Sequence, residues 1–192
     1  MEKTEKALKT GIGVVGLPGA GKSIVSEVAR EKHIPTIVMG DIIREICFER
    51  GLKVNSRNLG RLMIKIREEE GMDAVAKRTL PKILEVEGNI VIIDGLRSYE
   101  EVELFQKKLK KFIVIAIHAS SRTRYKRIQK RRRYDDAQNF KTFQKRDLRE
   151  INAGLAKIIA LADIVFVNEG KIRVLKSRIG RILQRIQDGI WR

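Results

Sequence analysis

The chain has 192 residues, 43% of them hydrophobic and 34% charged, which is enough for one globular domain with a full core. Its single cysteine, Cys47, excludes an internal disulfide framework and cannot form a zinc site alone. No stretch reaches the apolar length of a membrane span and the first residues carry no apolar export signal, so we expect a cytoplasmic protein without a membrane partner.

Five short apolar runs alternate with longer stretches of helical periodicity. The pattern predicts strands at 12–15, 35–39, 90–93, 112–117 and 163–167, and helices at 22–32, 41–50, 56–70, 73–87, 98–109, 120–133, 139–161 and 171–187. Strands that are apolar through most of their length are typical of parallel sheets covered by helices on both faces. We therefore expect residues 1–192 to form a single three-layer α/β/α domain with a five-stranded parallel sheet.

Two intervals are longer than one crossover helix requires. Residues 41–88 hold three helical patterns between the second and third strands, and we expect a helical insert there. Residues 118–150 carry 12 Lys and Arg against 4 Asp and Glu, which accounts for +8 of the net charge of +17. We expect a short basic lid at 120–146, because lobes above the carboxyl ends of parallel strands enclose ligands.

The stretch G-L-P-G-A-G-K-S at 16–23 lies between the first strand and the first helix. This is the phosphate-binding loop, or P-loop, in its required context, so the sheet is expected to be that of a P-loop NTPase. Its backbone amides face the phosphates, its lysine reaches the β- and γ-phosphates of ATP, and its serine offers a hydroxyl to Mg²⁺. The predicted ATP-binding residues of the loop are Gly16, Pro18, Gly19, Ala20, Gly21, Lys22 and Ser23.

Asp94 ends the third strand, where P-loop proteins place the carboxylate that holds Mg²⁺, often through water. Gly95 follows it, and not the glutamate with which motor-type ATPases activate water. The stretch N-E-G-K at 168–171 does not match the Asn-Lys-x-Asp motif of GTPases. The sequence therefore favours phosphoryl transfer from Mg-ATP to a bound acceptor over rapid hydrolysis.

Several further segments resemble the nucleoside monophosphate kinases, above all adenylate kinase. They read G-D-I-I-R at 40–44, L-G-R at 59–61, D-G-L-R at 94–97, R-I-Q-K-R-R at 127–132, and D-D at 135–136 followed ten residues later by Arg146. The D-G-L-R segment is one residue shorter than the family's segment and lacks its proline. The chain most resembles a group of archaeal adenylate-kinase-related proteins, and its ending at 162–170 is similar to that of dephospho-coenzyme A kinase.

The resemblance implies an acceptor site and a lid. The implied acceptor-binding residues are Gly40, Asp41, Arg44, Gly95 and Arg97. Arg127 and Arg131, which share one helical face with Arg124, would join Lys22 and Arg146 as catalytic residues that stabilise the transferred phosphoryl group. Asn168, in the dephospho-coenzyme A kinase-like ending, is placed with the ATP-binding residues, and Ser23 and Asp94 with Mg²⁺.

The expected function is transfer of the γ-phosphoryl group of Mg-ATP to a nucleotide. AMP is the first acceptor considered and dephospho-coenzyme A the second; the latter would react through a sugar hydroxyl, with Asp41 as the nearby carboxylate. Two alternatives remain: a nucleotide-dependent nucleic-acid-binding protein and a regulatory nucleotide sensor. The former is not favoured, because aromatic residues make up only 5% of the chain and do not interleave with the basic tracts.

Overall fold

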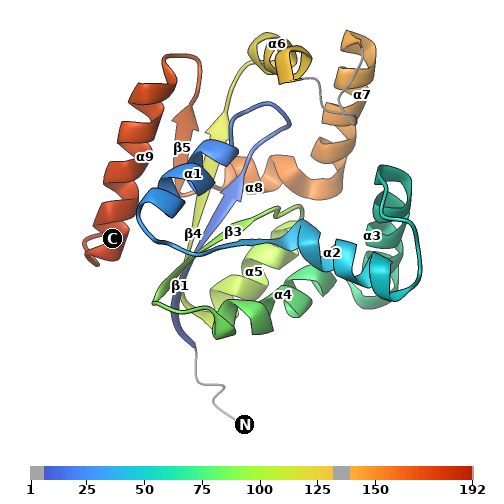
Figure 1. The fold of residues 1–192 in the computed structure, drawn as a ribbon, viewed down its shortest axis with the longest axis horizontal. Helices are drawn as coiled ribbons and strands as arrows, with labels where there is room; N and C mark the ends of the chain where they lie inside the picture. Colours follow the sequence, from blue (N-terminus) through green and yellow to red (C-terminus); the bar gives the residue numbers. More distant parts are fainter. Residues whose placement is uncertain (1–6, 132–138, 192) are drawn as a thin grey trace.

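The computed structural model describes residues 7–131 and 139–191, and its fold is drawn in Figure 1. Five strands form one sheet: β1 (Ala7–Val15), β2 (Thr36–Val38), β3 (Ile90–Asp94), β4 (Leu109–His118) and β5 (Ile164–Val167). Their order is β2-β3-β1-β4-β5 and every neighbouring pair is parallel. The predicted five-stranded parallel sheet is confirmed.

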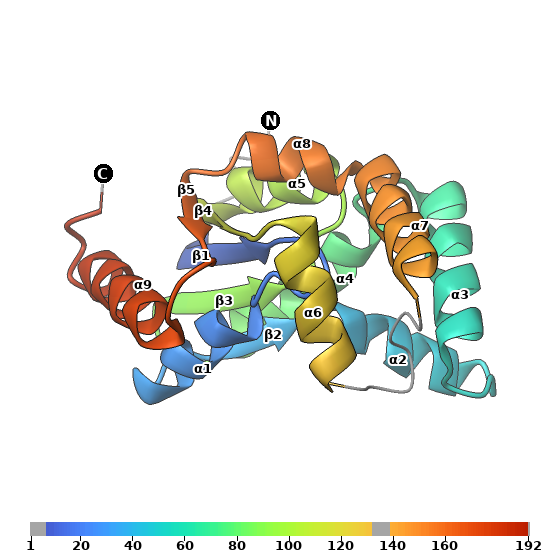
Figure 2. The same ribbon diagram turned by 90° about the horizontal axis from the view of Figure 1, so that it is seen from above.

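Helices cover both faces of this sheet, as Figure 2 shows from above. They are α1 (Ser23–Glu31), α2 (Met39–Glu49), α3 (Ser56–Glu70), α4 (Ala74–Glu85), α5 (Tyr99–Lys108), α6 (Ser121–Arg131), α7 (Phe140–Glu150), α8 (Ala156–Ala160) and α9 (Ile172–Gln187), with a π-helical segment η1 (Ile151–Leu155) between α7 and α8. Helices α1 and α9 lie on one face, and α4, α5 and α8 on the other. Within the described residues no helix is long and apolar enough to cross a membrane.

The sheet has a core on each side, because successive side chains of a strand point to opposite faces. In β4, Phe112, Val114 and Ala116 pack with α4 and α5. The alternate residues Ile113, Ile115 and Ile117 pack with α1 and α9. Burial on both faces explains why the strands are apolar through most of their length rather than at every second position.

The prediction of one continuous helix at 139–161 is wrong, because the segment is interrupted. The chain runs as α7, η1 and α8, with Gly154 at φ 110° inside the π-helical segment. A glycine adopts this angle without the steric penalty that other residues incur. A Cβ atom at Gly154 would lie 3.1 Å from the carbonyl oxygen of Arg97, so the break brings this segment close to the loop after β3.

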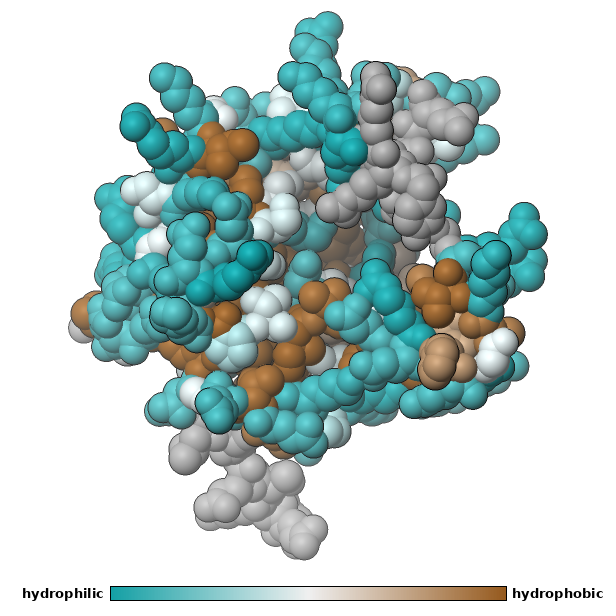
Figure 3. Space-filling model, viewed as in Figure 1, coloured by the Kyte–Doolittle hydropathy of each residue, from teal (hydrophilic) through white to brown (hydrophobic). Residues whose placement is uncertain are grey.

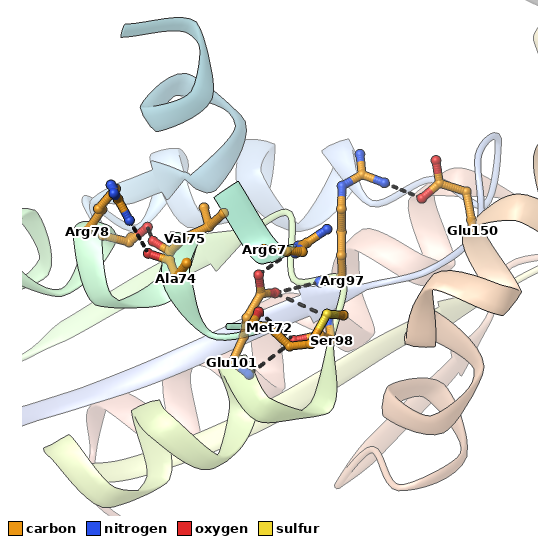
Figure 4. A network of polar contacts seen from close by, with 10 residues as sticks. Arg67, Met72, Ala74, Val75, Arg78, Arg97, Ser98, Glu101 and Glu150 are labelled. Carbon is orange, nitrogen blue, oxygen red and sulfur yellow. Dashed lines mark hydrogen bonds and ion pairs between the residues drawn. The ribbon is translucent and has the colours of Figure 1, made fainter. Parts of the chain in front are cut away.

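A buried glutamate joins α3 to the loop between β3 and α5 (Figure 4). Glu101 forms a capping box with Ser98 at the start of α5, and its Oε2 accepts the backbone N–H of Arg97 at 2.7 Å. Its Oε1 accepts from Nη2 of Arg67 on α3 at 2.8 Å. The hydroxyl of Ser98 donates to the carbonyl of Met72, between α3 and α4. The backbone position of Arg97 is therefore set by residues of α3 and α5.

Close packing at the middle of β1 generates the first prediction. A Cβ atom at Gly13 would lie 2.5 Å from Cδ1 of Leu96 and 2.8 Å from Cζ of Phe112, so Gly13→Ala should lower the free energy of unfolding by about 1–3 kcal/mol through overpacking. The matched control is Gly60→Ala in α3, where a Cβ meets nothing within 4 Å. That change should raise the free energy of unfolding by about 0.5–1 kcal/mol. Urea denaturation measures both, and equal effects of the same sign would contradict the packing argument.

The second prediction concerns the buried ion pair. The side chain of Glu101 is fully buried and that of Arg67 is 9% exposed, so Glu101→Gln leaves the guanidinium without its counter-charge. We expect the free energy of unfolding to fall by about 3–5 kcal/mol. Glu103→Gln on the exposed side of α5 is the control, with an expected change within about 0.5 kcal/mol. Similar stabilities of the two variants in urea denaturation would show that the buried pair does not hold the loop.

Candidate active site

The phosphate-binding loop and Asp94 meet because their strands are neighbours. In the parallel register of β1 and β3, Val14 pairs with Asp94, so the aspartate lies beside the start of the loop. A cleft of about 450 Å³ opens at this carboxyl edge of the sheet. The predicted site residues that line it are Gly16, Pro18, Gly19, Gly21, Lys22, Ser23, Asp94, Gly95, Arg97, Arg127, Arg131 and Arg146. Figure 3 shows the hollowed face, largely hydrophilic, in the same view as Figure 1.

Two glycines of the loop are required both by their positive φ angles and by the atoms that pack against them. Gly19 has φ 81°, and a Cβ there would lie 2.7 Å from the carbonyl oxygen of Arg124. Gly21 has φ 105°, and a Cβ there would lie 2.4 Å from Nδ2 of Asn168. The loop thus lies directly against α6 and the segment after β5, with no room for larger residues.

Asn168 and Arg127 bind the carbonyl groups of the loop. The buried amide of Asn168 donates from Nδ2 to the carbonyl of Ala20 at 2.8 Å. Arg127 donates from Nη2 to the carbonyl of Asn168 at 2.8 Å, and from Nη1 to the carbonyls of Gly19 and Ala20 at 3.5 and 3.4 Å. Ala20 and Asn168, both predicted to bind ATP, are buried and are not among the residues that line the cleft. Direct contact of either with ATP stays a prediction.

Lys22 and Asp94 are oppositely charged groups in a partly desolvated site. Nζ of Lys22 donates to the carbonyl of Gly16 at 2.7 Å. Burial lowers the pKa of Lys22, an effect that the charge of Asp94 opposes. Burial likewise raises the pKa of Asp94, against the charges of Lys22 and Arg97. Each group therefore reduces the free-energy cost of keeping the other ionised inside the protein.

The site fits a bound Mg²⁺. The Oδ1 atom of Asp94 is buried and has no hydrogen-bond partner among the described residues. Buried polar atoms are rarely left in that state in a native protein, and a carboxylate oxygen is a ligand that Mg²⁺ prefers. The exposed Ser23 lines the same cleft and can supply the hydroxyl.

Arg124, Arg127 and Arg131 share one face of α6 but differ in their surroundings. Arg124 is only 3% exposed and forms a bidentate ion pair with Asp147 of α7, with N–O distances of 2.8 and 2.5 Å. It also donates to the carbonyls of Ala119 and Pro18. Arg124 is therefore a structural residue that joins α6, α7 and the P-loop. Arg127 and Arg131 line the cleft, together with Arg146 of α7.

The predicted acceptor residues are not brought together. Gly95 and Arg97 line the cleft, whereas Gly40, Asp41 and Arg44 at the start of α2 do not. Arg44 instead forms an ion pair with Asp41, and both side chains are more than half exposed. The roles of these three residues stay predictions. The predicted lid residues Asp135 and Asp136 lie outside the residues that the structure describes.

Glu150 is a cleft residue that the sequence patterns did not identify. It is the last residue of α7, lines the cleft, and forms an ion pair with Nη1 of Arg97 (Figure 4). A signal was available, since Glu150 lies one helical turn after Arg146 and shares its face. Within the described part of the chain, Glu150 and Asp94 are two carboxylates against five cationic side chains in the cleft lining, an excess of positive charge that suits a polyphosphate.

Comparison with known proteins identifies relatives of the chain and solved structures with the same fold. A family model described as an AAA domain matches residues 12–149. The UPF0200 protein of Hyperthermus butylicus is 44% identical over 173 residues, which cover 90% of this chain and 92% of that protein. Two solved structures share the fold. TT1252 from Thermus thermophilus has a TM-score of 0.65 and 18% identity, and the match covers 96% of this chain and 99% of that one. Shikimate kinase from Bacteroides thetaiotaomicron has a TM-score of 0.62 and 17% identity, and the match covers 91% of this chain and 98% of that one.

These findings confirm a P-loop fold of the kinase kind, and they do not single out adenylate kinase among such proteins. The sequence match extends over nearly the whole length of the relative, so it is not confined to the phosphate-binding loop. The chain belongs to the UPF0200 protein family.

Proposed function

We propose that the chain is an ATP-dependent phosphotransferase that moves the γ-phosphoryl group of Mg-ATP to a small anionic acceptor. The observation that carries this proposal is that the P-loop, Asp94 and a set of arginines line one cleft of about 450 Å³. Phosphoryl transfer needs the donor and acceptor aligned and the charge on the moving group neutralised, and this cleft supplies groups for both tasks. The kinase fold of its structural neighbours supports the same chemistry.

On the donor side, the loop amides and the amino end of α1 face the phosphates, and Lys22 binds the β- and γ-phosphate oxygens. Ser23 and Asp94 are the residues that would hold Mg²⁺, which would neutralise charge that develops on the phosphate oxygens. Arg127, already docked on the loop carbonyls, keeps the loop shaped as the phosphates bind.

On the transfer side, Arg131 and Arg146 reach the cleft from α6 and α7 and stabilise the moving phosphoryl group with Arg127. The buried pair of Arg124 with Asp147 joins these two helices. Arg97 is the acceptor-side cation and binds an anionic group of the acceptor.

Two nucleotide acceptors fit this arrangement. AMP would attack the γ-phosphorus through a phosphate oxygen and dephospho-coenzyme A through a hydroxyl, and each carries phosphate for Arg97. Gly40, Asp41 and Arg44 contribute only if the insert of α2 and α3 closes toward the cleft, as acceptor-binding lobes of such enzymes do on binding substrate. The two acceptors differ chemically in whether the attacking oxygen carries a proton.

Replacing the loop lysine tests the proposal. Wild-type protein with Mg-ATP and a panel of AMP, CMP, UMP, GMP and dephospho-coenzyme A should yield a phosphorylated acceptor, detected by chromatography. Lys22→Met should lower the rate of transfer by about 10²-fold or more, because a transition-state charge contact is lost. Lys107→Met, an exposed change on α5, should act as wild type. Acceptor-independent release of ADP alone, or equal rates in Lys22→Met and wild type, would refute phosphotransfer at this loop.

The magnesium assignment has its own test. With ATP and a chelator, the midpoint of thermal unfolding should rise by a similar amount in wild type and in Asp94→Asn. Added Mg²⁺ should raise the midpoint further in wild type and in the exposed control Asp188→Asn, but not in Asp94→Asn. Only the deprotonated carboxylate binds Mg²⁺, and burial raises the pKa of Asp94. The extra increase in wild type should therefore disappear on acidification at a higher pH than an ordinary aspartate would require. An unchanged Mg²⁺ response in Asp94→Asn would remove Asp94 from the site.

A further inference from the structure

Glu150 is a carboxylate in the cleft for which the donor side of the reaction has no use. Its side chain is 14% exposed, and it lines the cleft with Lys22 and Asp94. Burial lowers the pKa of Lys22, and the charge of Glu150 opposes this shift as that of Asp94 does, so the carboxylate lies within electrostatic range of the loop lysine. Its ion pair with Arg97 places it on the acceptor side (Figure 4).

The position of Glu150 is fixed from both sides along the chain. One helical turn before it, Asp147 forms the buried ion pair with Arg124 that joins α7 to α6. Just after it, the π-helical segment brings Gly154 against the carbonyl of Arg97, so closely that a Cβ atom on the glycine would lie 3.1 Å from that oxygen. Such π-helical turns occur frequently at functional sites. A side chain held in this way is preorganised toward whatever the cleft binds.

The charge of Glu150 distinguishes between two kinds of acceptor. An acceptor that attacks through a phosphate oxygen is already an anion, so it needs no base and is repelled by a fixed carboxylate. An acceptor that attacks through a hydroxyl must lose a proton as its oxygen bonds to phosphorus, and a carboxylate beside it can take that proton. Asp94, the other carboxylate that the described residues contribute to the cleft lining, is engaged in the proposed Mg²⁺ site.

We propose that Glu150 is a catalytic residue that accepts the proton of an acceptor hydroxyl, an inference that rests on the proposed phosphotransfer. The acceptor is then a hydroxyl-bearing anion. The hydroxyl oxygen forms a bond to the γ-phosphorus, and the bond from that phosphorus to the oxygen bridging it to the β-phosphate breaks. ADP leaves with the electron pair of that bond, and the hydroxyl proton passes to the carboxylate of Glu150. The product is a phosphate monoester.

Arg97 completes the recognition of such an acceptor. Its guanidinium has five N–H donors, and its bond to Glu150 is made through Nη1, on one side of the fork. The pair therefore presents a hydrogen-bond acceptor and a fork of donors side by side, a complement to a hydroxyl next to a phosphate or carboxylate. This assignment replaces Asp41, which the sequence favoured for the carboxylate and which lies exposed, paired with Arg44, outside the cleft lining.

The chemical nature of the product is the first test. Wild-type protein is incubated with Mg-ATP labelled on the γ-phosphate and, separately, with AMP, dephospho-coenzyme A, shikimate and glycerol 3-phosphate. All four carry a hydroxyl and an anionic group, and AMP can also yield a diphosphate through its phosphate, so the bond that the label enters separates the two chemistries. We expect label in a phosphate monoester, with no label entering ADP made from AMP.

The second test is Glu150→Gln, which keeps the shape of the side chain and removes its basicity. We expect kcat for the hydroxyl acceptor to fall by about 10²–10⁴-fold, with KM nearly unchanged. The increase in the thermal unfolding midpoint on adding Mg-ATP should match that of wild type, which shows that the donor side is intact. Glu85→Gln, an exposed change on α4, is the control and should keep the wild-type kcat and KM.

The outcomes separate this inference from the function on which it rests. A diphosphate product overturns the role of Glu150 and leaves phosphotransfer standing. So does an undiminished kcat in Glu150→Gln, or a raised KM with unchanged kcat, which would make the residue only a partner that positions Arg97. If wild type transfers label to none of the four acceptors, the proposed function falls and the inference falls with it.

Discussion

The buried ion pair between Arg124 and Asp147 is the interaction on which the geometry of the cleft depends. Both groups are almost wholly removed from water, and such a pair is stable only if the remaining donors are also satisfied. Here they are, because Arg124 also donates to the carbonyls of Ala119 and Pro18. One guanidinium thus fixes α6, α7 and the P-loop relative to one another. The side chains that α6 and α7 contribute to the cleft are thereby held in place relative to the P-loop.

A second buried carboxylate, that of Glu101, fixes the loop on the proposed acceptor side of the cleft. Glu101 binds the backbone N–H of Arg97 and the guanidinium of Arg67, so the loop after β3 is tied to α3. Gly154 allows the π-helical segment to approach the same loop closely. Arg97 is therefore located by α3, α5 and η1 together.

Much of this fold could be predicted from the sequence, because strand and helix patterns and the P-loop are local. The apolar runs placed all five strands, and the strand-end position of Asp94 followed from chain order alone. What could not be predicted depends on partners distant in the chain. Arg124 and Arg127 are the same residue type, one helical turn apart, and only the position of Asp147 on another helix buries the first and leaves the second in the cleft. Gly154 looked like a helix residue because its neighbours are good helix formers; the approach of Arg97 decides its conformation.

The difference between local patterns and contacts between distant parts of the chain also explains why the donor of the phosphoryl group is easier to infer than the acceptor. The donor side is one contiguous stretch, 16–23, joined by Asp94 through the register of two adjacent strands. The acceptor side is assembled from the loop after β3 and the end of α7, and its chemistry depends on how these lie against each other. Arg97 alone indicates an anion, and Glu150 alone would read as one acid in a basic segment. Placed together, they form the surface that we propose accepts a proton and binds an anion, and no motif encodes this juxtaposition.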